Sequence, residues 1–265
     1  MPKIRKMQAE DWEQFHKMDT ELFPEDGMEE DFFRRRVEHD GFFALTEEDQ
    51  IIGNLIVTRF GKDEAHLGRI GVSKAHQRKG YGSLLMQKAI DWFRNEGGIR
   101  EAHLYTQDFN RSAQSLYKKF GFKRAGTTWH YYVTYESLEP NEKYICQEIQ
   151  EEEIDGVGGM FASMPPKAIR RFMEYEDQNV FVLKDGNGKV QGVCRFTPKF
   201  PGCFPFEITN VDCFDDFMSG IQKFSLPEYD YCRVTFTDLP ELAELCEKRE
   251  YRLHHRLHKM SLNLD

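Results

Sequence analysis

The chain has 265 residues, of which 40% are hydrophobic and 31% are charged, and its formal net charge at pH 7 is −9. Its length allows one large domain or two of ordinary size, and it lacks the basic surplus that general nucleic-acid binding requires. No apolar run reaches the roughly 18 residues that a membrane-spanning helix needs, and the amino terminus lacks the apolar core of a signal peptide. We therefore expect a cytoplasmic protein without nucleic-acid or membrane partners.

The first half of the chain shows strand and helix patterns in a definite order. Helices are predicted where apolar residues recur every three or four positions, and a hairpin where two apolar runs flank a polar turn. The predicted elements are a strand at 2–7, helices at 9–23 and 28–40, a hairpin at 41–60, a strand at 64–72, a helix from residue 80, a strand at 101–107, a helix between Asn110 and Gly121, and a strand at 121–136.

A polar segment at 137–143 separates this order from a similar one in the second half. The second set of predicted elements is a strand at 144–150, helical pieces about Met160 and Ile169, strands at 179–185, 189–196 and 206–211, a helix at 215–224, a strand at 231–236, a helix at 240–249 and a strand at 251–264. The repeated order indicates duplication. We therefore predict two domains, at 1–139 and 140–265.

The stretch QRKGYG, residues 77–82, lies between a predicted strand and a predicted helix. It is not a P-loop, and it lacks the third glycine of a dinucleotide-binding fingerprint. Its glycines nevertheless let successive backbone N–H groups approach a phosphate, at a helix end that favours anions, and Arg78 and Lys79 add positive charge. The stretch therefore predicts a pyrophosphate site. No such loop precedes the helix at 215–224, so the second domain is expected to lack the site.

This loop and the helix that begins near Asn110 resemble motifs A and B of the GNAT superfamily of N-acetyltransferases. The loop fits the motif A pattern [QR]-x-x-G-x-[GA], and residues 110–122 have an Asn before the helix, Tyr117 within it and Gly-Phe at its end. The resemblance covers residues 3–135. It implies an α+β GNAT fold, with a mixed, mostly antiparallel central sheet flanked by helices, in two tandem copies. The second copy is degenerate, with Glu250 where a glycine would normally stand.

The resemblance also implies acetyl-CoA as a co-substrate and no metal. The strand that ends at Val72 would pair its backbone with the pantetheine arm, and an N–H near Val72 would face the thioester oxygen. Asn110 would either orient the pantetheine amide or only cap its helix. The cofactor-binding residues implied in this way are Ile70, Val72, Gln77, Arg78, Lys79, Gly80, Tyr81, Gly82, Ser83 and Asn110.

Catalytic roles are less complete in this sequence than in the family. Tyr117 matches the tyrosine that often acts as general acid towards the coenzyme A thiolate, although it also lies on the buried stripe of its helix. Many relatives place a glutamate two to four residues before the position of Val72, where this chain has Gly68, Arg69 and Ile70. The nearest candidate bases are His66 and Glu64, whose direction on the strand the alternation of side chains leaves open. Deprotonation relayed by water to an acidic residue elsewhere, such as Glu21, is an equal alternative.

We therefore predict an acetyl-CoA-dependent N-acetyltransferase that moves an acetyl group directly to a primary amine in a ternary complex. The acceptor would be a small molecule or a peptide. The second domain would shape the acceptor pocket or a homodimer surface. The alternative is a non-catalytic, GNAT-like scaffold that binds acyl-CoA or a partner, which the missing glutamate favours.

Overall fold

The computed structural model describes residues 2–24, 26–60, 63–95 and 98–264. Its contacts divide the chain into unit 1, residues 1–125 with 259–265, and unit 2, residues 126–258. These units do not coincide with the predicted domains, which meet at a single boundary after residue 139. Strands β6 (Lys123–Thr134) and β12 (Arg252–Asn263) each contribute residues to both units.

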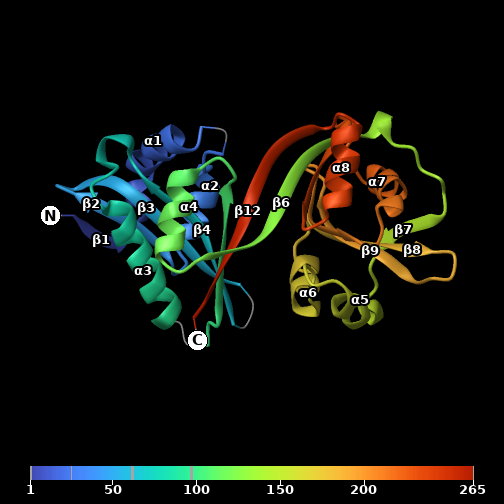
Figure 1. Ribbon diagram of the computed structural model, residues 1–265, viewed down its shortest axis with the longest axis horizontal. Helices are drawn as coiled ribbons and strands as arrows, with labels where there is room; N and C mark the ends of the chain where they lie inside the picture. The colour runs from blue at the N-terminus through green and yellow to red at the C-terminus, as the bar shows by residue number, and fades with distance from the viewer. Residues whose placement is uncertain (1, 25, 61–62, 96–97, 265) are drawn as a thin grey trace. The chain divides into compact units, whose positions relative to one another are not determined.

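Unit 1 is a sheet with a pair of helices on each face (Figure 1). The strand order is β1-β2-β3-β4-β5, with the last residues of β12 beside β5. Strands β1 to β4 pair antiparallel, whereas β4 and β5 are parallel. The elements are β1 (Lys3–Lys6), α1 (Trp12–Leu22), α2 (Glu30–Val37), β2 (Phe42–Glu47), β3 (Gln50–Phe60), β4 (Glu64–Val72), α3 (Tyr81–Asn95), β5 (Glu101–Gln107) and α4 (Arg111–Lys119).

Each face of this sheet has its own apolar core. Helices α1 and α2 bury Phe15 and Phe33 against Phe42 of β2. Helix α3 buries Leu85 and Phe93 on the opposite face. Because each buried Phe or Leu side chain contributes about 1.5–3 kcal/mol, strand β4 is held firmly between two packed layers.

Unit 2 repeats the element order of unit 1. Its strand order is β12-β6-β11-β10-β9-β8-β7, and β10 and β11 form a parallel pair. Helices α7 and α8 cover one face and α5 and α6 the other. The elements are β7 (Tyr144–Glu148), α5 (Ile154–Met160), α6 (Pro166–Met173), β8 (Asn179–Asp185), β9 (Val190–Thr197), β10 (Gly202–Ile208), α7 (Phe214–Gln222), β11 (Tyr231–Thr237) and α8 (Pro240–Lys248).

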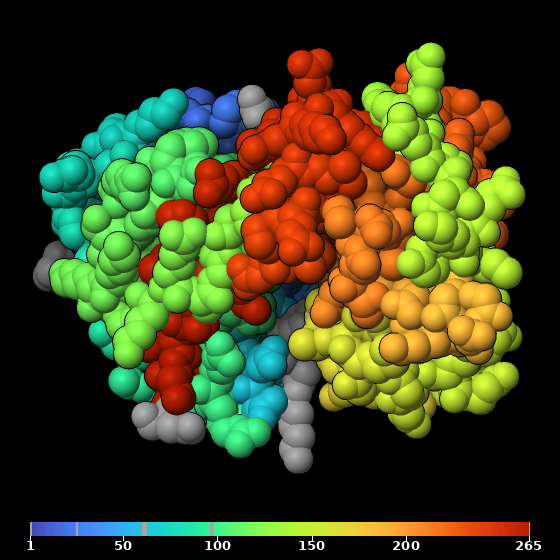
Figure 2. Space-filling view, turned by 45° about the vertical axis from the view of Figure 1, so that its right-hand side comes forward, coloured from blue at the N-terminus to red at the C-terminus, as the bar shows by residue number. Residues whose placement is uncertain are grey.

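Helix α8 illustrates how the apolar pattern of unit 2 orients an element. Leu242 and Cys246 are buried against the sheet, whereas Glu241 and Glu244 are exposed. Figure 2 shows residues of this helix on the surface, in orange-red. Leu242 and Cys246 are four residues apart and Glu241 and Glu244 are three apart, and either spacing places a pair on one face of a helix.

The predicted fold class is confirmed. Both units contain a mixed, mostly antiparallel sheet flanked by helices, and the element order occurs twice. Within the described residues, no helix is both long and apolar enough to cross a bilayer.

Candidate active site

Strands β4 and β5 separate towards their carboxyl ends. Their parallel pairing extends only from Glu64 with Glu101 to Leu67 with Leu104. Beyond Leu67, strand β4 continues to Val72 along β3 alone. Its other edge therefore offers backbone groups to a ligand, because buried N–H and C=O groups require partners.

A pocket of about 540 Å³ opens beside this edge. It is lined by β4, the loop before α3, the start of α3, and helix α4. Nine of the residues predicted for the site line it, namely Ile70, Val72, Gln77, Arg78, Gly80, Gly82, Ser83, Asn110 and Tyr117. Two segments that are far apart in the sequence thus form one pocket.

The loop before α3 has the geometry of an anion site. Arg78 and Gly80 have φ values of 64° and 86°, a left-handed conformation that glycine adopts at little cost. The side chain of Gln77 anchors the loop by donating to the Val72 carbonyl at 3.0 Å. Within the described structure, the backbone N–H groups of residues 78–82 donate to no protein acceptor. Together with the helix dipole, they can bind a phosphate.

Two residues predicted to contact the cofactor do not line this pocket. The Tyr81 hydroxyl donates to Glu47 Oε1 on β2 at 2.9 Å, so this side chain serves to anchor α3 to the sheet. Lys79 is exposed on the loop. Its role towards a phosphate stays a prediction based on charge alone.

Helix α4 contributes Asn110 and Tyr117. The Asn110 side chain accepts from the Ala113 N–H at 3.0 Å, which is an N-cap, and also borders the pocket. Tyr117 is only 7% exposed, and burial raises its pKa to about 12. Its phenol therefore keeps its proton at all ordinary pH values.

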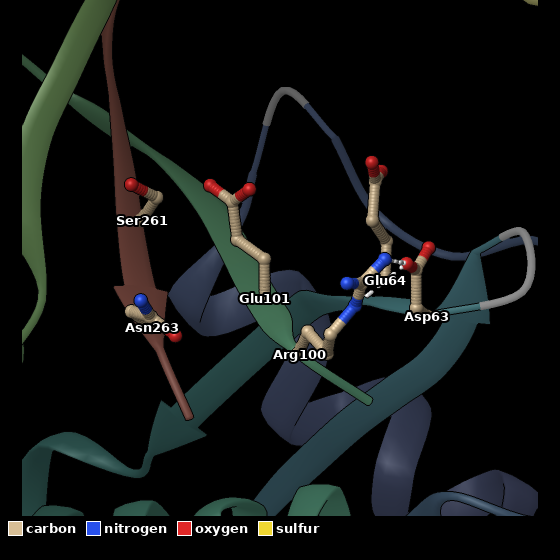
Figure 3. A pocket seen from close by; sticks show the side chains of 6 residues that line it. All are labelled: Asp63, Glu64, Arg100, Glu101, Ser261 and Asn263. Carbon is tan, nitrogen blue, oxygen red and sulfur yellow. Dashed lines mark hydrogen bonds and ion pairs between the residues drawn. The ribbon is translucent and has the colours of Figure 1, made fainter. Parts of the chain in front are cut away.

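His66 and Glu64 lie towards the other end of β4, outside this pocket. The His66 ring stacks on that of His103 with 4.9 Å between centroids, and burial lowers its pKa to about 4. Glu64 lines a separate pocket at the start of the strand (Figure 3), beside the ion pair of Arg100 and Asp63. Burial raises the Glu64 pKa, and the charges of Glu101 and Asp63 add to this. Neither residue is therefore placed to act at Tyr117.

Acid pH is expected to destabilise the protein through His66. Since its folded pKa lies about 2.5 units below the ordinary 6.5, the unfolded chain takes up a proton that the folded chain does not as pH falls from 6.5 to 4. Between pH 7.5 and pH 4.5, the free energy of unfolding of His66→Phe should therefore fall by about 1–3 kcal/mol less than that of the wild type. Urea unfolding at both pH values measures this. His39 is exposed, so His39→Gln serves as the control and should lose as much stability as the wild type. If His66→Phe also lost as much stability as the wild type, the prediction would be contradicted.

Several lining residues could not be recognised from the sequence. Leu22 and Phe23, at the end of α1, form part of the wall together with Gly71. Arg69, the residue before Ile70, is paired with the buried Asp19 at 3.0 Å. None of the described residues that line the pocket carries a carboxylate or an imidazole.

In unit 2, the end of β10 and the start of α7 carry buried apolar side chains. Strands β10 and β11 pair only at Gly202 with Arg233 and Cys203 with Val234. Phe206 and Ile208, further along β10, are buried, as is Phe214 at the start of α7. The scaffold is thus repeated, and these three side chains belong to the apolar core of unit 2.

The model of the acetyltransferase (GNAT) family matches residues 3–122. Over 106 residues, the chain is 31% identical to the [ribosomal protein bS18]-alanine N-acetyltransferase of Salmonella typhimurium, a match that covers 40% of this chain and 70% of that protein. The chain therefore belongs to the GNAT family of acetyltransferases, and it is an N-acetyltransferase. Acetyl-CoA is the acetyl donor of this family.

Solved structures resemble the whole chain. A GCN5-related N-acetyltransferase from Sphaerobacter thermophilus matches with a TM-score of 0.72 at 13% identity, over 99% of this chain and 95% of that one. A tandem GNAT protein from the clavulanic acid biosynthesis pathway matches with a TM-score of 0.67 at 11% identity, over 99% and 98% of the two chains. At such identities the similarity shows the fold, which here includes its duplication.

Proposed function

We propose that unit 1 binds acetyl-CoA in the pocket beside β4 and transfers its acetyl group directly to a primary amine in a ternary complex. One observation carries the proposal: a single pocket brings together unpaired loop N–H groups, a free strand edge and a buried tyrosine. The loop at 77–83 would hold the pyrophosphate, and the edge at Ile70–Val72 would pair with the pantetheine arm. A backbone N–H of that edge would stabilise the oxyanion.

Tyr117 would give its proton to the departing thiolate. The transfer forms a C–N bond and breaks the C–S bond, so the coenzyme A sulfur leaves with a negative charge that requires a proton. A phenol with a pKa of about 12 is a weak acid towards a thiol of pKa near 8.5, so position beside the sulfur has to provide the advantage. The phenol would be restored by the proton that the amine loses.

The acceptor class is proposed from the chemistry and from the relatives. The Salmonella relative acts, by its name, on an alanine of ribosomal protein bS18. A peptide with a free α-amino group is therefore the first acceptor to test, with small primary amines as the second class. Unit 2 would contribute to acceptor binding or to a homodimer.

A calorimetric titration of the full-length protein with acetyl-CoA tests the cofactor site. We expect one site per chain, because residues 209–213, which precede α7 in unit 2, include neither a glycine nor a basic residue. Two sites would show that unit 2 also binds the cofactor. No binding would overturn the proposal.

The sequence also left open a non-catalytic scaffold that binds acyl-CoA, which the family assignment argues against. The lack of a carboxylate or imidazole among the described lining residues favours it, because an ammonium must lose a proton before it attacks. The two functions separate in one assay. An enzyme releases coenzyme A faster when one member of an amine and peptide panel is added, whereas a scaffold shows slow release that no member accelerates.

A further inference from the structure

The loop before α3 is flanked by two side chains that meet the same carboxylate. Residues 77–80 of this loop, which border the pocket, lie between His76 and Tyr81. The Tyr81 hydroxyl donates to Glu47 Oε1 at 2.9 Å, and His76 Nε2 lies 3.9 Å from Glu47 Oε2. One carboxylate therefore lies against the residues at both ends of the loop.

Glu47 presents this carboxylate from a well-defined hairpin. It is the last residue of β2 and pairs with Gln50 of β3 across a two-residue turn. Glu48 and Asp49 in that turn have φ values of 50° and 63°. Positive φ at both central residues is the turn geometry that matches the twist of a hairpin. The position of the carboxylate is thus set by the sheet and not by the loop.

His76 is also held from its other side. Its Nδ1 is hydrogen-bonded to the Ser73 hydroxyl at 2.8 Å, and the Ser73 N–H donates to the Ile52 carbonyl of β3 at 2.9 Å. Contacts therefore run from β3 through Ser73 and His76 to Glu47 and on to Tyr81. A loop held in this way binds a ligand more tightly than one that has to be ordered, because less conformational entropy is lost on binding.

We propose that Glu47 is a positioning residue that fixes the loop before α3 in the conformation that receives the pyrophosphate of acetyl-CoA. This inference rests on the proposed function and adds to it a residue outside the site. Glu47 is not among the described residues that line the pocket, so it acts through His76 and Tyr81. Its negative charge would by itself repel a pyrophosphate, so its benefit lies in placing the loop.

Two substitutions separate placement from charge. Glu47→Gln and Glu47→Ala both remove the negative charge, but the amide oxygen of glutamine can still accept from the Tyr81 hydroxyl. The full-length wild type and both variants are titrated with acetyl-CoA by calorimetry. We expect Glu47→Ala to lose about tenfold in affinity, which corresponds to about 1.4 kcal/mol. Glu47→Gln should bind at least as tightly as the wild type.

Acetyl-pantetheine shows whether the effect is confined to the loop, because it carries the thioester and the pantetheine arm without the pyrophosphate. Its affinity, measured by ligand-observed NMR, should agree within about twofold among the wild type and both variants. Tyr81→Phe removes one hydroxyl. Adding it to Glu47→Ala should cause no further loss of acetyl-CoA affinity, because both substitutions break the same hydrogen bond.

A control variant tests for a general effect of removing a paired carboxylate. Glu153, which forms an ion pair with Lys184 in unit 2, is partly buried like Glu47. Glu153→Ala should bind acetyl-CoA with the affinity of the wild type.

The outcomes are distinct. Wild-type affinity for acetyl-CoA in Glu47→Ala, or equal losses in Glu47→Ala and Glu47→Gln, would overturn the role of Glu47 and leave the cofactor site intact. An equal loss of acetyl-pantetheine affinity in Glu47→Ala would overturn that role as well. Failure of the wild type to bind acetyl-CoA would overturn the proposed function, and this inference with it. Should Glu47→Ala not fold, Tyr81→Phe alone has to weaken acetyl-CoA binding and leave acetyl-pantetheine binding unchanged.

Discussion

Gly80→Glu should lower the affinity for acetyl-CoA at least about a hundredfold and leave the protein folded. The residue has a φ of +86°, and a Cβ built there meets nothing within 4 Å, so a longer side chain has room. Its carboxylate would then stand at the anion loop, where it repels the pyrophosphate at close range. The left-handed conformation adds only about 1 kcal/mol of strain. Calorimetry with acetyl-CoA measures the loss.

Two controls isolate the cause. Gly188, in the hairpin of unit 2, has a φ of +79° and equally open surroundings, so Gly188→Glu reproduces the strain and the charge away from the site. It should bind acetyl-CoA like the wild type. Gly80→Gln separates bulk from charge and should bind better than Gly80→Glu. If Gly80→Glu kept its affinity, the loop would not be the pyrophosphate site.

The loop and the cap of α4 could be predicted from sequence because both are local. Left-handed backbone at Gly80 and at Gly121 follows from the residue type and its place beside a helix end. Asn110 likewise caps the helix that begins at the next residue. The degenerate copy departs from this rule, because Glu250 has a φ of 56° at the position that corresponds to Gly121 although it is not a glycine.

The directions of the β4 side chains could not be predicted, because a bulge changes the alternation. Ala65 and Leu67 face the core beneath α3, and simple alternation would place Arg69 there too. The pairing with β3 shifts register at Gly68, so Ile70 packs on that core instead and Arg69 faces α1. A bulge depends on the partner strand, which the local sequence does not reveal.

The far wall of the pocket was also beyond sequence reasoning. Leu22 and Phe23 reach it from α1, nearly fifty residues before Gly71. Neither of them belongs to a motif. Residues 259–265 belong to unit 1 although they follow unit 2 in the sequence. This too depends on long-range strand pairing, which a single boundary in the sequence does not describe.

Tyr117→Phe should lower turnover by about a hundredfold and leave acetyl-CoA affinity and the unfolding midpoint nearly unchanged. The change removes one hydroxyl, while the ring keeps its edge contact with Phe122, whose centroid lies 6.3 Å away. Because burial raises the pKa of Tyr117 to about 12, the group stays protonated as pH rises through 10. Wild-type turnover should therefore show no decline centred near pH 10. The assay uses whichever amine the acceptor panel identifies.

Tyr131 of β6 is the matched control. It is 1% exposed, burial raises its pKa to about 12 as well, and its hydroxyl is buried without a hydrogen-bond partner. Tyr131→Phe removes the same group from unit 2 and should keep full turnover with equal or greater stability. Equal losses in both variants would indicate a general effect of altering a buried tyrosine. Wild-type turnover in Tyr117→Phe would leave Tyr117 a packing residue, and the thiolate would then take its proton from another donor.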